Sequence, residues 1–438
     1  MNWITTLQSL LWSGWTSLLD YLAAHVLLCL LPAFIIAGYM SAMIPKEAIT
    51  RFLGPRASKW VSYPAAAFGG FILAVCSCTI LPLFAGIWKR GAGLGPAVTF
   101  LFVGPAINIL ALTYTGAAIG FDIALARLIL SIFFGIAIGL LMGWIFRKEE
   151  TQSKAEANLF AAGATVRPAI WAVFGLLVAI LIAGTLQIPA LTQTYLTLHL
   201  PWNLPPAILA ALESVNLSVQ GATLIGLLIV IAFLAWKGFE NIYEGFSGWT
   251  MATLVVIALT ILLAAPITQS GSLVIGLTGR FFAILILLAT TAWVAARAFD
   301  QDDLSNWIAE TWKFVKQIFP LLIVGVFLAG VAKGLIPEAW VRAVAGQNTL
   351  WANLAGVLFG VFMYFPTLVE VPVARMFLDL GMARGPLLAY LLADPELSLQ
   401  SILVLNGIMG RKKTSVYVSL VALLSTLAGY LFGAFLAR

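Results

Sequence analysis

The chain of 438 residues carries 24 Lys and Arg and 18 Asp and Glu, and 62% of its residues are hydrophobic. Charged residues make up 10% of the chain, against roughly a quarter in soluble domains, so the composition excludes an ordinary soluble enzyme. The formal net charge of +6 does not indicate nucleic-acid binding, because the basic residues lie in small groups between apolar runs, as the positive-inside tendency predicts.

Residues 2–19 show a weak amphipathic pattern of Trp and Leu among polar residues, which predicts a helix lying in the membrane interface ahead of the first span. Apolar runs of about 20 residues then recur along the chain, and each is long enough to cross the hydrocarbon region as a helix. The clearest runs are 21–44, 121–144, 168–188, 249–265, 281–296 and 414–436. We therefore expect an all-α polytopic membrane protein with about ten transmembrane helices.

The two ends of the chain repeat each other. When residues 70–143 are laid without gaps on residues 360–433, an offset of 290 residues aligns many glycines and prolines. The aligned pairs include Pro82 with Pro372, Gly91 with Gly381, Pro105 with Pro395 and Gly139 with Gly429. Because these residue types shape the backbone, the agreement predicts two structural repeats.

Basic residues predict that the repeats lie in opposite orientations. Arg147 and Lys148 follow the last span of the first repeat, whereas three basic residues at 411–413 precede the equivalent span of the second repeat. Because positive residues concentrate on the cytoplasmic side, the two spans should cross in opposite directions. We expect a first repeat in 1–146, a cytoplasmic connector in 147–167, middle helices in 168–299 and a second, inverted repeat in 300–438.

Each repeat contains an apolar stretch that proline interrupts, at 60–90 and at 351–380. Pro82 lacks an N–H and its ring clashes with the carbonyl of Cys78, so the helix should be broken or kinked there. Pro366 and Pro372 lie six residues apart, which argues against a continuous helix in the second repeat. Inverted repeats with broken helices are typical of secondary transporters, whose solute sites lie where these helices meet. We therefore expect two re-entrant or half-helix hairpins, buried in protein or lining a cavity.

The first hairpin carries two thiols directly before its proline, in the run Cys76-Ser77-Cys78-Thr79. In an unwound segment these sulfur and hydroxyl groups can turn toward one solute, which predicts a binding site for a thiophilic compound. The alternative is that Cys76 and Cys78 are small packing residues at a close helix contact. Cys29, in the first span, is a candidate third thiol ligand, although a lone cysteine in an apolar helix usually packs.

Glu370 is the acidic candidate in the second hairpin, between Thr367 and Pro372. A carboxylate at this depth costs several kcal/mol unless it is paired, bound to an ion or protonated, so its default interpretation is functional. Burial favours the neutral form, which makes Glu370 a candidate proton carrier. The alternative is a structural ion pair with Arg375, about one and a half helical turns further on.

Polar residues also follow each hairpin, close to a second proline. In the first repeat Asn108 lies three residues after Pro105. The equivalent segment of the second repeat carries Asp394, Glu396 and Ser398 around Pro395. We expect these side chains to line the solute pathway from the two repeats. The alternative is that they satisfy backbone groups that the prolines leave free.

The remaining polar residues give weaker indications. Arg127 and Arg280 are isolated basic residues for which snorkelling to the interface is the commoner explanation, with binding of an anion or a structural carboxylate as the alternatives. The sequence has no glycine-rich phosphate loop of the P-loop type, and its two histidines do not have the spacing of a zinc motif. We therefore expect no ATP hydrolysis, no resident metal and no cofactor.

The run 70–83, which includes Cys76-Ser77-Cys78 and Pro82, closely resembles the bacterial predicted-permease family that includes organoarsenical efflux permeases. The resemblance extends through 89–92, 102–108, 378–382, 393–395 and the final span. It implies an inner-membrane protein that exports trivalent organoarsenicals, with Cys76, Cys78 and Pro82 at matching positions. Pro366 and Thr367 stand where the first repeat has cysteine and serine, so thiol chemistry is expected in one repeat only.

These observations predict a permease of the bacterial inner membrane, a secondary transporter that moves a small solute between two inverted repeats. The expected partners are the lipid bilayer, the solute and protons as the coupling ion, and efflux of a thiophilic compound is the expected activity. Uptake of a small sulfur-containing or other anion is an alternative, in which half-helix N-termini and basic residues attract the solute. A membrane thiol oxidoreductase using Cys76 and Cys78 is a weaker alternative, because redox pairs usually have Cys-x-x-Cys spacing.

Overall fold

The computed structural model describes most of the chain, and its residues form two compact units. The described residues are 3–23, 30–54, 57–73, 77–107, 109–147, 167–185, 188–200, 205–215, 217–240, 242, 245–262, 267–269, 273–335, 338–362 and 367–435. Unit 1 comprises Met1–Trp15, Pro45–Ala164 and Gln317–Arg438, and unit 2 comprises Thr16–Ile44 and Thr165–Lys316. Helices α1 (Trp3–Tyr21) and α16 (Gln301–Leu335) each run from one unit into the other.

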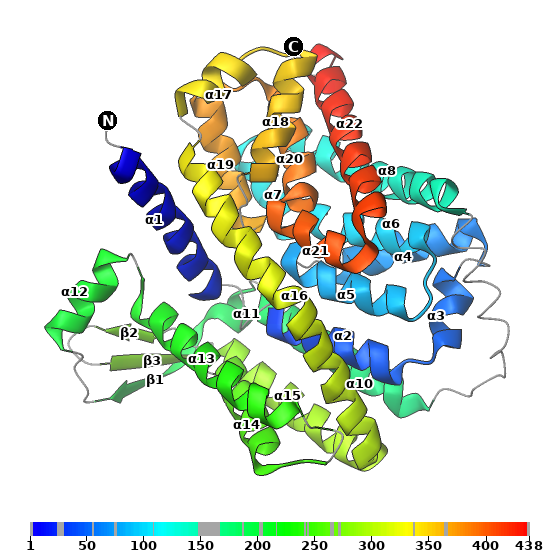
Figure 1. The fold of residues 1–438 in the computed structure, drawn as a ribbon, viewed down its shortest axis with the longest axis vertical. Helices are drawn as coiled ribbons and strands as arrows, with labels where there is room; N and C mark the ends of the chain where they lie inside the picture. The colour runs from blue at the N-terminus through cyan, green and yellow to red at the C-terminus, as the bar shows by residue number, and fades with distance from the viewer. Residues whose placement is uncertain are drawn as a thin grey trace. The chain divides into compact units, whose positions relative to one another are not determined.

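Unit 1 is built of helices from both ends of the chain (Figure 1). In chain order they are α3 (Lys46–Leu53), α4 (Lys59–Leu73), α5 (Ser77–Lys89), α6 (Leu94–Ala106), α7 (Ile109–Ala118), α8 (Phe121–Ile145), α17 (Glu338–Ala345), α18 (Leu350–Phe362), α19 (Thr367–Asp379), α20 (Arg384–Leu397), α21 (Leu399–Met409) and α22 (Arg411–Phe435).

Two pairs of these helices have matching bounds at the offset of 290 residues. Helices α5 and α19 begin and end 290 residues apart, and so do α8 and α22. The turn after α5 has Gly91 at φ 90° and the turn after α19 has Gly381 at φ 95°, a left-handed conformation that glycine adopts readily. In each turn the glycine N–H donates to the carbonyl three residues earlier, at 3.0 and 2.9 Å. We call residues 59–145 repeat 1 and residues 349–435 repeat 2.

Glycines bring equivalent helix pairs of the two repeats into backbone contact. A Cβ atom on Gly139 of α8 would lie 2.6 Å from the carbonyl oxygen of Gly95 in α6. A Cβ atom on Gly429 of α22 would lie 2.5 Å from the carbonyl oxygen of Gly385 in α20. Small residues at such interfaces allow close packing of membrane helices. The aligned glycines of the sequence therefore mark the same helix contact in each repeat.

Of the two expectations for Pro82, the break is wrong, because α5 continues through this proline from Ser77 to Lys89, and the kink stays a prediction. Helix α19 likewise runs from Thr367 to Asp379 through Pro372. Each proline is the sixth residue of its helix, so it removes one hydrogen bond to the first turn. Membrane helices tolerate such a loss when neighbouring groups satisfy the freed carbonyl. The separation expected in the second repeat lies upstream of Pro372, between α18 and α19.

A bend follows the last proline of each repeat. Pro395 lies inside α20, and α20 and α21 meet at Ser398 at an angle of 43°. Pro105 lies inside α6, and the axes of α6 and of residues 111–118 of α7 differ by 45°. The prolines at these two places therefore precede real changes of helix direction.

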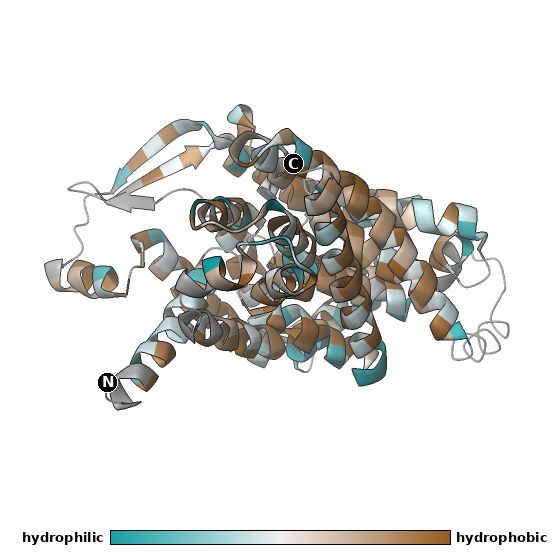
Figure 2. Cartoon of the chain, turned by 90° about the horizontal axis from the view of Figure 1, so that it is seen from above, coloured by the Kyte–Doolittle hydropathy of each residue, from teal (hydrophilic) through white to brown (hydrophobic). Residues whose placement is uncertain are grey.

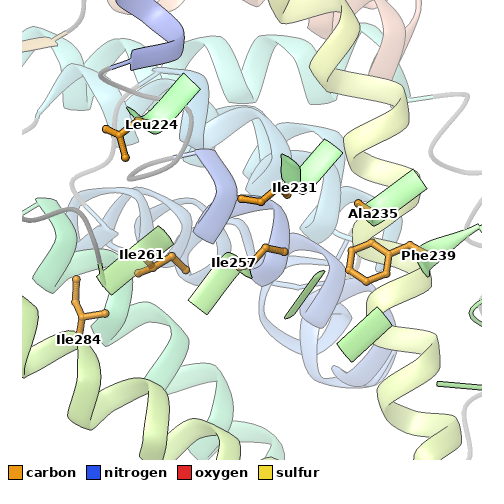
Figure 3. Packing of buried hydrophobic residues seen from close by; sticks show 7 residues of the cluster. All are labelled: Leu224, Ile231, Ala235, Phe239, Ile257, Ile261 and Ile284. Atoms are coloured by element: carbon orange, nitrogen blue, oxygen red, sulfur yellow. The ribbon is translucent and has the colours of Figure 1, made fainter. Parts of the chain in front are cut away.

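Unit 2 contains the middle of the chain and has a core of branched apolar side chains. Its helices are α2 (Leu31–Met43), α10 (Pro168–Thr185), α11 (Pro189–Thr192), α12 (Pro206–Ser214), α13 (Val219–Phe239), α14 (Gly248–Leu262) and α15 (Gly279–Ala298). Leu224, Ile231 and Ala235 recur on one face of α13, at the spacing of an amphipathic helix. They pack with Ile257 of α14 and Ile284 of α15 (Figure 3). This cluster holds the three helices together.

A small antiparallel sheet in unit 2 was not expected from the sequence. Its order is β1-β3-β2, with β1 (Thr194–Leu200), β2 (Ile267–Gln269) and β3 (Leu273–Thr278). The sequence TYLTLHL of β1 places leucine at every second position near its end, which is the period of a strand. The fold is thus mainly helical, as expected, with this sheet added.

The helices expose apolar side chains in the manner of a membrane protein. In Figure 2 hydrophobic residues cover most of the helical ribbon. Among the described residues, five helices are long and apolar enough to span a membrane, or seven if each bent pair is one span. Helices α2, α10, α14 and α18 are shorter apolar helices. The chain is therefore a polytopic helical membrane protein, and about ten crossings stays a prediction.

Candidate functional site

A fully buried ion pair in unit 1 joins α8 to α19. Arg127 Nη2 of α8 donates to Glu370 Oε2 of α19 at 3.0 Å, and neither side chain has any exposed surface. Glu370 belongs to the first turn of α19, where the helix dipole favours a negative charge. The pair joins repeat 1 to repeat 2.

The alternative ion pair between Glu370 and Arg375 is wrong. Arg375 instead pairs with Asp379 one turn further along α19, at 3.1 Å, and its Nη1 donates to the carbonyl of Ala118 at 3.2 Å. Both side chains of the Arg375–Asp379 pair are more than half exposed. Arg375 thus makes its contacts at the C-terminal end of α19, and the ion-pair partner of Glu370 is Arg127.

Snorkelling is also the wrong explanation for Arg127. The buried residues of α8 form a stripe at helical spacing that includes Ile123, Arg127, Ser131, Gly135 and Gly139. Arg127 therefore lies on the face of α8 that packs against the rest of the protein, and its side chain has no exposed surface. Arg127 is in phase with the buried residues Ser131, Phe134 and Ile138, at separations of 4, 7 and 11 residues. The second isolated arginine, Arg280, is half-buried in the first turn of α15.

Helix α20 brings two further carboxyl groups to this region. Asp394 and Glu396 have 1% and 3% of their surface exposed, and both lie within electrostatic range of Arg127 and Glu370. Asp394 packs against α18, where a Cβ atom on Gly360 would lie 3.1 Å from its Cα. Glycine at this position allows α18 to approach the backbone that carries the carboxyl group.

Two buried tyrosines, Tyr390 and Tyr417, lie beside these charged side chains. Together with Arg127, Glu370, Asp394 and Glu396 they form what we call the buried polar group. Tyr417 of α22 donates from its hydroxyl to Glu396 Oε2 at 2.8 Å. Tyr390 lies on α20 one turn before Asp394 and is fully buried. Tyr417 is the repeat 2 equivalent of Arg127, since 127 plus 290 is 417. Equivalent positions on α8 and α22 therefore both present a long polar side chain to a buried carboxyl group.

Several buried atoms of this group have no hydrogen-bond partner among the described residues. They are Arg127 Nε and Nη1, Glu370 Oε1, Asp394 Oδ1, Glu396 Oε1 and the Tyr390 hydroxyl, and on α21 both polar atoms of the buried Gln400 side chain also have no partner. Buried polar groups are usually hydrogen-bonded, so this concentration of unpaired atoms is characteristic of a site that takes up a ligand, water or protons. In the described part of the chain, no three His, Cys, Asp or Glu side chains are placed to hold a metal ion.

The remaining predicted residues differ in how far the structure describes them. Cys29, Cys76 and Asn108 lie outside the described residues, and of Ser77, Cys78 and Thr367 only the backbone is described, in the first turns of α5 and α19. Thr79 and Pro82 are buried on α5, whereas Pro372 is exposed on α19. Ser398 accepts from the N–H of Ser401 at the start of α21 and its hydroxyl lies 2.7 Å from that of Ser401.

The chain is similar to two UPF0718 proteins. The UPF0718 protein MJ0584 of Methanocaldococcus jannaschii is 35% identical over 417 residues, which are 95% of this chain and 94% of that protein. The UPF0718 protein YraQ of Escherichia coli is 28% identical over 126 residues, which are 28% of this chain and 36% of that protein. No solved structure matches the chain.

The family match covers nearly the whole chain and confirms the resemblance that residues 70–83 carry. It extends over residues 11–434, and so includes both repeats, the buried ion pair and the middle helices. The chain also has helices that are long and apolar enough to cross a bilayer. Because the family match covers nearly all of it, the chain belongs to the family of predicted permeases.

Proposed function

We propose that the chain is a secondary permease in which a small solute crosses the membrane at the contact between repeat 1 and repeat 2. The observation that carries this proposal is the Arg127–Glu370 ion pair, because it joins the repeats with both side chains fully buried. Ionisable side chains inside a membrane protein are costly and mark solute or ion pathways. Membership of a predicted-permease family agrees with this role.

Contacts between the repeats support opposite orientations. Lys413, near the start of α22, lies 5.8 Å from the ring centre of Phe146, which directly follows α8. At the other end of α8, Asp122 in the first turn pairs with Arg384 at the start of α20, at 2.6 Å. The start of α22 thus lies beside the end of its equivalent, α8. This pattern is expected when equivalent spans cross in opposite directions.

Basic residues assign the two ends of these spans. Arg147 follows α8, and three basic residues at 411–413 begin α22. Lys413 also lies over the ring of Trp88 at the end of α5, next to Lys89 and Arg90. We assign this end to the cytoplasm by the positive-inside rule, in the inner membrane of a bacterial cell.

The pairs α4–α5 and α18–α19 have the lengths of half-helix hairpins. These helices have 13 to 15 residues, fewer than the roughly 20 needed to span the hydrocarbon region. Helix α5 begins at Ser77, directly after Cys76, and the N-terminus of a half helix is a common place for a solute in transporters.

Two thiols at this position suit a soft, thiophilic solute, because thiolates are soft ligands. We therefore assign to this chain the efflux of a trivalent organoarsenical, with Cys76 and Cys78 as its ligands and Thr367 in the first turn of the equivalent helix α19. The buried carboxyl groups beside Arg127 couple this movement to protons.

A flux measurement in sealed everted vesicles tests this function, with methylarsonous acid as the probe. Vesicles with the native protein should accumulate the probe, and the Cys76→Ser/Cys78→Ser variant should fall to the level of vesicles without the protein, because serine does not bind trivalent arsenic tightly. Cys29→Ser is the matched control and should retain most of the native flux. Native flux in the double variant would overturn the assignment of the thiols, and no flux in native vesicles would overturn the solute.

A further inference from the structure

The buried polar group of unit 1 contains more acids than bases. Its described members include three buried carboxyl groups, Glu370, Asp394 and Glu396, and one buried cation, Arg127. The undescribed segments 74–76, 108 and 363–366, which adjoin these helices, contain no charged residue. One guanidinium therefore faces three acids in the interior of the membrane-embedded unit.

The helices that pack against α20 add no further fully buried charge among the described residues. Helices α6, α18 and α21, which pack against α20, contain no titratable side chain. Helix α8 contributes Arg127, helix α19 contributes Glu370 and helix α22 contributes Tyr417. The other charged residues of these three helices are exposed or half-buried, namely Asp122, Arg375, Asp379, Arg411, Lys412 and Lys413. Among the described residues of α20 and the helices that pack against it, the buried charged groups are thus one cation and three carboxyl groups.

Only one of the three acids can be neutralised by Arg127. The guanidinium donates to Glu370 at 3.0 Å, and no hydrogen bond from it reaches Asp394 or Glu396. An ionised carboxylate that is buried without a cation costs several kcal/mol in protein and more in a membrane. Two such carboxylates would repel each other and Glu370 as well.

We infer that Asp394 and Glu396 are the proton-binding site of the permease and hold two exchangeable protons, while Glu370 is the fixed counter-ion of Arg127. The role of this site in coupling rests on the proposed function. The proton carrier is thus assigned to Asp394 and Glu396 of α20, in place of Glu370. Each carboxyl group releases its proton to water on one side of the membrane and takes one back from water on the other. No other bond changes.

The position of the two acids suits this exchange. Both lie in the last turn of α20, directly before the 43° bend at Ser398, so a change in that bend would move them relative to Arg127. Tyr417 already donates to Glu396, and the Tyr390 hydroxyl and the Gln400 amide have no partner among the described residues. These groups can hold water or relay a proton toward the acids.

Infrared difference spectroscopy of the full-length protein in lipid vesicles at neutral pH tests the inference without any solute. Native protein should show the carbonyl band of protonated carboxyl groups, shifted in D₂O. Asp394→Asn and Glu396→Gln should each remove about half of the exchangeable part of that band. Asp122→Asn, which deletes an exposed carboxylate, is the matched control and should leave the band unchanged.

Every outcome of this experiment bears on the inference. A native spectrum without the band, or an unchanged band in both variants, would overturn it. A neutral amide mimics a neutral carboxyl group, so both variants should also fold with native thermal midpoints. A variant that fails to fold would contradict the inference that Asp394 and Glu396 are protonated. If the bands behave as expected and vesicles still do not transport methylarsonous acid, the proposed solute fails while the proton site stands.

Discussion

Replacing Arg127 with Gln should destabilise the protein by about 3–5 kcal/mol, because Glu370 would be left as a buried carboxylate without its cation. Glu370→Gln should have a similar cost, since it leaves the guanidinium buried and unpaired. The pair has no exposed surface, so solvent cannot compensate for the missing partner. Unfolding by denaturant in detergent micelles, followed by circular dichroism, measures both effects.

The double variant Arg127→Gln/Glu370→Gln should recover most of this stability, because removing both charges removes the penalty of an unpaired one. The Asp122–Arg384 pair offers a matched control, as its side chains are 47% and 40% exposed. Breaking that pair with Arg384→Gln should cost no more than about 1 kcal/mol. Equal losses of unfolding free energy for Arg127→Gln and Arg384→Gln would contradict the account of the buried pair. So would a double variant whose loss equals the sum of the losses of Arg127→Gln and Glu370→Gln.

Single cysteines at equivalent positions should be labelled from opposite sides of the membrane. Asp122 and Lys412 are equivalent in the two repeats, as are Lys89 and Asp379, because each pair is separated by 290 residues. All four are exposed at helix ends. In a background with the three native cysteines replaced by Ser, a membrane-impermeant maleimide added to intact cells should label Asp122→Cys and Asp379→Cys only.

The result of this labelling is close to all-or-none, because a position faces one aqueous side or the other. Lys412→Cys and Lys89→Cys should react only after the cells are opened, which serves as the control that these positions are reactive. Labelling of Asp122→Cys and Lys412→Cys from the same side would show parallel repeats. The proposed orientation, and the assignment of the cytoplasmic end, would then be wrong.

The matching helix bounds and three of the four charged members of the buried group could be predicted from the sequence. Glycine and proline set the backbone, so their alignment at an offset of 290 residues predicted helices with matching bounds. Glu370, Asp394 and Glu396 stood out because acids are rare in apolar segments. Whether Cys76 and Asn108 join them stays a prediction, since both lie outside the described residues.

The parts that sequence reasoning missed depend on contacts far apart in the chain. The partner of Glu370 is 243 residues away, whereas Arg375 is near Glu370 in sequence but pairs with Asp379. Pro82 and Pro372 do not end their helices, since in the second turn of a helix a proline removes one hydrogen bond. The strand Thr194–Leu200 is hard to predict from the sequence, because Pro189 and Pro201 flank it and its alternating pattern is short.

Solute exchange by the double variant Arg127→Gln/Glu370→Gln tests most directly the claim that the pathway runs through the contact between the repeats. This variant should be folded, so a change in transport can be separated from a loss of structure. In vesicles loaded with methylarsonous acid, native protein should exchange the probe across the membrane, and the folded double variant should exchange it no faster than vesicles without protein. Exchange by the double variant at the native rate would contradict the account.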